Sequence, residues 1–142
     1  YVGENAASEP ETQAIKRIVD ESKLTLHIDH HSYSEIFLAP WSYKTEPHPD
    51  RKKINDLMKK LKHTIFQRSG RQYDIGGSEL LYQASGVCPD YSTSQGAWGI
   101  TMELSPKMDF YGGGFMLPAR DILPTVMDAW EVAVAAVDYV KG

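Results

Sequence analysis

The chain has 142 residues, of which 42% are hydrophobic and 24% charged, which suits one globular domain with a true core. Its formal net charge is −4 and its basic residues are scattered among acidic ones, so nucleic acid is not an expected partner. No hydrophobic run reaches the roughly 18 residues that span a bilayer, so no membrane partner is expected, and a single cysteine, Cys88, excludes an internal disulfide.

The first predicted element is a helix that begins in the segment Ser-Glu-Pro-Glu at residues 8–11. That segment fits a capping box with a proline inside the first turn. An apolar stripe follows, which we expect to pack on a sheet. Its members are Ala14, Ile15, Ile18 and Val19.

A strand is predicted after this helix, because hydrophobic residues alternate at Leu24, Leu26 and Ile28. Asp29, His30 and His31 come at its carboxyl end, where α/β proteins place their chemistry.

This cluster does not make a metal site by itself. His27, Asp29 and His31 share one face of the strand, but a rise of about 3.3 Å per residue puts the two histidines about 13 Å apart. Asp29 and His31 together fall short of the three protein ligands of a catalytic zinc. The alternative, hydrogen-bonded histidines without a metal, stays open at this stage.

The middle of the chain predicts a loop and a scaffold helix. Three prolines between residues 40 and 50 indicate the loop. Apolar residues at helical spacing predict an amphipathic helix over residues 50–68, with Asp50 as its cap and Gly70 beyond its end.

Residues 73–91 are rich in glycine and predict irregular structure in which Tyr82 precedes a small-residue turn that would let it move. The alternative for Tyr82 is a plain surface aromatic on a loop.

A second strand is predicted over residues 98–104, with Gly99, Thr101 and Glu103 on one face. A carboxylate near the end of an apolar strand is costly to bury unless it is paired or used. Glu103 is therefore a candidate general base, and the alternative is a salt-bridged edge residue.

A glycine-rich loop at residues 111–114 precedes a last helix over residues 123–140 with Pro124 in its first turn. Its predicted buried side consists of Val126, Trp130, Val134, Val137 and Val140.

Four motifs, taken in order, resemble the C-terminal half of zinc metallocarboxypeptidases of the pancreatic carboxypeptidase A/B type. They are His-Ser-Tyr-Ser at residues 31–34, Tyr-Gln-Ala-Ser-Gly at 82–86, Met-Glu-Leu at 102–104 and Phe-Met-Leu-Pro at 115–118. The resemblance covers essentially the whole chain. It implies an α/β fold: a mixed, mostly parallel twisted sheet with helices on both faces, of which residues 1–142 form the C-terminal portion of a single catalytic domain with no second domain. The chain also starts without Met, as a piece of a longer protein would.

The resemblance also implies site roles. His31 matches the third zinc ligand, Tyr33 a substrate-subsite tyrosine and Tyr82 a lid tyrosine that closes over the substrate. Glu103 matches the general base, which takes a proton from the attacking water and passes it to the leaving amine. By the same correspondence, cis peptide bonds are expected at Ser32–Tyr33, Pro40–Trp41 and Ser105–Pro106.

The specificity pocket departs from the basic-specific members of the family. Pro89 falls at the pocket floor, where those members place an aspartate, and Ala84 and Thr101 match the wall. An apolar or aromatic C-terminal substrate residue is therefore expected. Asp29 falls next to this pocket and would admit a basic or mixed preference.

The chain lacks other parts of the family's site. It contains no His-x-x-Glu motif for the other two zinc ligands, and no counterpart of the carbonyl-polarising arginine or of the Asn-Arg pair that binds the substrate carboxylate. The resemblance thus implies a Zn²⁺-dependent hydrolase of the metalloprotease class that acts on peptide or protein C-termini, needs an N-terminal half and works in an extracellular, secreted or vacuolar setting. The alternative is a non-catalytic fragment or peptide-binding module that keeps the fold.

Overall fold

The computed structural model describes residues 3–108 and 114–142. The predicted glycine-rich loop therefore lies, except for Gly114, outside the described residues. The elements follow in the order α1 Pro10–Ser22, β1 Leu26–Ser32, β2 Ile36–Leu38, α2 Arg51–Ser69, β3 Asp74–Gly76, a 3₁₀ turn Ser78–Leu80, α3 Cys88–Ser94, β4 Trp98–Leu104 and α4 Ala119–Lys141. Within the described part of the chain, none of the helices is long and apolar enough to cross a membrane.

The predicted mixed α/β sheet is confirmed. Four strands lie in the order β1-β4-β2-β3. β1 runs parallel to β4 and β2 parallel to β3, whereas β2 and β4 are antiparallel. The strand predicted from the alternation at Leu24, Leu26 and Ile28 begins at Leu26, continues through the histidine cluster and ends at Ser32.

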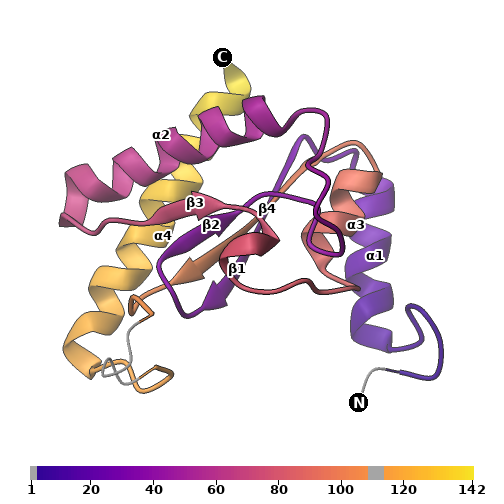
Figure 1. Cartoon of the computed structure of the whole chain (residues 1–142), viewed down its shortest axis with the longest axis horizontal. Helices are drawn as coiled ribbons and strands as arrows, with labels where there is room; N and C mark the ends of the chain where they lie inside the picture. Colours follow the sequence, from indigo (N-terminus) through magenta and orange to yellow (C-terminus); the bar gives the residue numbers. More distant parts are fainter. Residues whose placement is uncertain (1–2, 109–113) are drawn as a thin grey trace.

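Helices cover both faces of this sheet (Figure 1). Ile100 and Met102 of β4 are fully buried in a core that includes Ile54 and Leu61 of α2 and Val132 of α4. α3 lies on the opposite face, because a Cβ on Gly99 would lie 2.1 Å from the carbonyl oxygen of Pro89 and alternate residues of a strand face opposite sides. α1 packs beside α3, where the Tyr91 hydroxyl donates to Asp20 Oδ1 at 2.5 Å.

The two outer helices correct the sequence prediction. α1 is capped by Glu9 without a side-chain cap bond, and the Ser8 hydroxyl donates to Glu9 Oε1 instead, so the predicted capping box is wrong. Of its apolar stripe only Val19 is buried. α4 begins at Ala119, so Pro124 lies inside it rather than in its first turn.

The predicted buried side of α4 is exposed in this chain. The side that packs on α2 carries Thr125, Asp128, Val132 and Ala136. We call the exposed large apolar residues of α4 the α4 stripe; they are Ile122, Leu123, Val126, Trp130, Val134, Val137 and Val140. The periodicity located the most apolar face of the helix, but nothing within the described residues covers that face.

The other elements agree better with the sequence. α2 follows its N-cap Asp50 and ends before Gly70, which has a φ of 76°, the left-handed conformation that glycine adopts without strain. All three expected cis peptide bonds are present. The segment predicted as irregular contains β3 and α3, which its glycines and Pro89 concealed.

Candidate functional site

The candidate site lies where β1 and β4 end side by side. The parallel pairing sets His31 of β1 directly opposite Glu103 of β4, and Asp29 opposite Thr101 one step earlier. Because both strands alternate with period two, these four side chains share one face of the sheet. The sheet therefore brings the predicted metal ligand and the predicted base together.

Glu103 has the environment of a reactive carboxyl group. Its Oε2 atom is buried and has no hydrogen-bond partner among the described residues, and no salt bridge to it is present in the described part. Burial raises the pKa of Glu103 above its ordinary value, and the nearest charges, His31 and Asp29, act in opposite directions. The salt-bridged edge residue is thus not what the structure shows, and the free oxygen suits a group that accepts a proton.

Two of the three histidines of β1, His27 and His31, have different surroundings. His27 Nδ1 lies 3.0 Å from the Ser92 hydroxyl of α3, which is the plain hydrogen-bonded role. The His31 side chain is 49% exposed, and its Nε2 lies 3.1 Å from Asp29 Oδ2. The described residues contain no group of three or more His, Cys, Asp or Glu side chains that could hold a metal ion.

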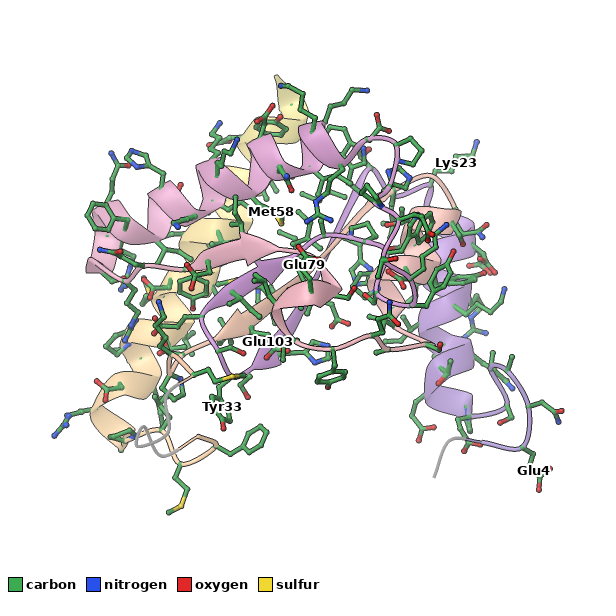
Figure 2. The ribbon with its side chains drawn as sticks, in the orientation of Figure 1. Glu4, Lys23, Tyr33, Met58, Glu79 and Glu103 are labelled. Carbon is green, nitrogen blue, oxygen red and sulfur yellow. The ribbon has the colours of Figure 1, made fainter. Side chains whose placement is uncertain are left out.

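Tyr33 is held in a defined place next to these strand ends. Its ring meets Phe115 edge-on, with centroids 5.0 Å apart and an interplanar angle of 90°, a favourable arrangement of two aromatic rings. A Cβ on Gly114 would lie 2.9 Å from the Tyr33 hydroxyl oxygen, so the ring packs directly on that backbone. Figure 2 shows Tyr33 and Glu103 in the same part of the molecule, as their neighbouring strand ends require.

The segments that carry the residues predicted to line the specificity pocket are linked by short contacts. Pro89 contacts the backbone at Gly99, two residues before Thr101 on the same face of β4. The backbone amide of Ala84 donates to the Ser42 carbonyl at 3.0 Å. Ser42 in turn donates its amide to the Asp90 carboxylate at 2.9 and 3.0 Å. The contact between Asp90 and Ser42 thus joins the start of α3, which carries Pro89, to the loop that carries Ala84.

Sequence reasoning missed Asp90 and Ser42. Asp90 is buried, and burial raises the pKa of its carboxyl group, although hydrogen bonds from the Ser42 amide and hydroxyl act against that rise. The two residues are 48 positions apart, so no local pattern links them. An acidic residue next to a proline in an apolar segment was the one available signal.

Tyr82 is not part of the assembled cluster. It lies on the loop between the 3₁₀ turn and α3, its side chain is 70% exposed, and no aromatic or hydrogen-bonded partner is present for it among the described residues. This placement suits both a surface aromatic and an open lid, so its role stays a prediction.

Comparison with known proteins places the chain in a family. The family model for zinc carboxypeptidases matches residues 1–132. The chain is 33% identical to human carboxypeptidase A1 over 142 residues and 34% identical to zinc carboxypeptidase A 1 of Anopheles gambiae over 132 residues. These alignments cover 98% and 88% of this chain, but only 33% and 30% of the two relatives.

Solved structures agree. The structure of bovine thrombin-activatable fibrinolysis inhibitor in complex with tick carboxypeptidase inhibitor matches with a TM-score of 0.89 and 30% identity, over 99% of this chain and 49% of that chain. The fold and the sequence thus lead to the same result: the chain belongs to the zinc carboxypeptidase family.

Proposed function

We propose that residues 1–142 are the C-terminal portion of a single catalytic domain, and that the complete domain hydrolyses the C-terminal peptide bond of peptides and proteins. The observation that carries this proposal is the unpartnered, buried Oε2 of Glu103 directly opposite His31. A base without a structural partner, next to an exposed imidazole, is the arrangement that metal-assisted hydrolysis needs.

His31 fits Zn²⁺ as one ligand of a larger set, because its ring is half exposed at the end of β1. When bound, zinc would act as a Lewis acid that activates water and polarises the scissile carbonyl. Glu103 takes the proton from the attacking water and delivers it to the leaving amine. Tyr33 contacts the bound peptide, and Tyr82 closes over it, a gating motion that its exposed loop permits.

We further propose that the substrate's C-terminal side chain is apolar or aromatic. Ala84, Pro89 and Thr101 carry no charge, and the packing of Pro89 against β4 favours a pocket that selects by shape and apolar contact.

The missing ligands and the missing carboxylate-binding residues are assigned to an N-terminal half. Its proposed place is beside β1, which lies at the end of the strand order. Leu26 and Ile28 of β1 are only partly buried, whereas Ile100 and Met102 of the neighbouring strand are fully buried. An open seven-residue edge and a half-covered core are features that another part of the same domain would cover.

A second candidate is a non-catalytic peptide-binding module that keeps the fold. The observation in its favour is that the substrate-side residues are grouped here, while the described residues supply no complete metal group. A functional zinc site in the full-length protein would exclude it.

The experiment is the substitution Glu103→Gln in the full-length protein. We expect turnover of a peptide with a C-terminal Phe to fall by about 10² to 10⁴-fold, the usual contribution of a general base, while peptide binding persists. Glu21→Gln on exposed α1 is the matched control and should leave turnover unchanged. Activity retained by Glu103→Gln would reject the assigned role.

The extracellular, secreted or vacuolar location is part of the proposal, and cell fractionation would test it.

A further inference from the structure

Asp29 has a contact that the proposed reaction does not use. Its Oδ2 atom lies 3.1 Å from Nε2 of His31, and its side chain is 30% exposed. The two residues are two positions apart on β1, so they project from the same face of the strand. Within the described residues, His31 is the only basic group that pairs with this carboxylate.

An imidazole that binds a metal uses one ring nitrogen and keeps a proton on the other. A carboxylate that accepts that N–H bond fixes the tautomer, sets the ring orientation and increases the basicity of the ligating nitrogen. Carboxylate partners of this kind matter for affinity, and their loss typically weakens metal binding by about 10- to 100-fold.

We propose that Asp29 is the positioning residue of His31: its carboxylate accepts a hydrogen bond from the Nε2–H group and leaves Nδ1 free to bind the metal. This inference rests on the proposed function, since it assigns a partner to the proposed ligand.

The competing use of Asp29 is recognition of a basic C-terminal residue in the pocket, because Asp29 lies opposite Thr101. The distance favours the positioning role, because Asp29 Oδ2 already lies 3.1 Å from Nε2 of His31. A carboxylate engaged with His31 is a weaker partner for a substrate cation. The two roles predict different losses, so one experiment separates them.

The experiment measures Zn²⁺ affinity of the full-length apo-protein by competition with a chelator. We expect Asp29→Ala to weaken Zn²⁺ binding by about 10- to 100-fold. Asp29→Asn keeps an acceptor without the charge, and because neutral hydrogen bonds have about half the strength of charge-assisted ones, the loss should be about 3- to 10-fold. Asp74→Asn, a carboxylate on β3 at the other edge of the sheet, is the control and should bind Zn²⁺ like the wild type.

Three results decide the inference. Graded losses in Asp29→Asn and Asp29→Ala support it, and if the Ala variant does not fold, the loss in the Asn variant is sufficient. Unchanged Zn²⁺ affinity in both variants overturns it, most clearly if kcat/KM falls only for substrates that end in Lys or Arg. If the wild type binds Zn²⁺ stoichiometrically and both variants bind it equally well, only this inference is overturned. If the wild type binds no Zn²⁺, the proposed function is overturned as well.

Discussion

Removal of the Asp128 carboxylate should destabilise the domain more than any other single change on α4. Asp128 is fully buried. It binds Nη1 of Arg68 at 2.8 Å and Nη1 of Arg71, and accepts a hydrogen bond from the Ser69 hydroxyl at 3.2 Å. Asp128→Ala leaves two guanidinium groups beside an empty buried site. Breaking a buried ion pair in this way costs about 3 to 5 kcal/mol.

The lower end of that range applies here. The side chains of Arg68 and Arg71 are 28% and 20% exposed, so water reaches them after the carboxylate is gone, and we expect a loss of about 3 kcal/mol. Urea unfolding of the full-length protein, followed by tryptophan fluorescence, measures it. Asp138→Ala, an exposed carboxylate on the same helix, is the control and should change the free energy of unfolding by less than about 0.5 kcal/mol. A loss below about 1 kcal/mol in Asp128→Ala would refute the reasoning, because the arginines would then be satisfied by solvent alone.

Three further predictions concern activity and assembly. Tyr82→Phe in the full-length protein should mainly raise KM, because the proposed lid role has the hydroxyl contact the bound peptide; a complete loss of the chemical step would contradict the lid role. A strong chelator should abolish peptidase activity and added Zn²⁺ should restore it, so activity that persists in the chelator would count against a zinc enzyme. The isolated 142-residue chain should self-associate in analytical ultracentrifugation through its open β1 edge and the α4 stripe, and a cooperative monomeric unfolding transition would contradict this.

Local patterns predicted the elements that carry the site. The alternation in β1 and β4 has period two over several residues, and α2 has a long amphipathic stripe with a glycine after its end. These signals are local and extend over several residues, and the structure follows them. Because the parallel pairing of β1 with β4 follows from the fold, the meeting of His31 with Glu103 could be anticipated from the resemblance, although not from either strand alone.

Shorter and more distant features could not be predicted. β2 and β3 have three residues each, too few to show a period. α3 has seven residues and includes Pro89 and four hydroxyl residues. It is held in place by the contact of Asp90 with Ser42, 48 positions away. Glu35, which accepts a hydrogen bond from the Ser105 hydroxyl at 2.7 Å, is another long-range contact without a local signal.

The incorrect prediction for α4 is informative about the whole domain. The α4 stripe is the most apolar face of the helix, yet Trp130 is 61% exposed. A cavity of about 200 Å³ is lined by Ser32 at the end of β1 and by Ile122 and Val126 of the α4 stripe, so the uncovered helix face and the open strand lie next to each other. His31 is the residue before Ser32 on that same strand. The core and the proposed metal site are therefore both incomplete at the β1 edge, although on opposite faces of the sheet, and the proposed N-terminal half beside β1 would cover α4 and supply the remaining ligands together. A stand-alone peptide-binding module would need a separate explanation for each of these features.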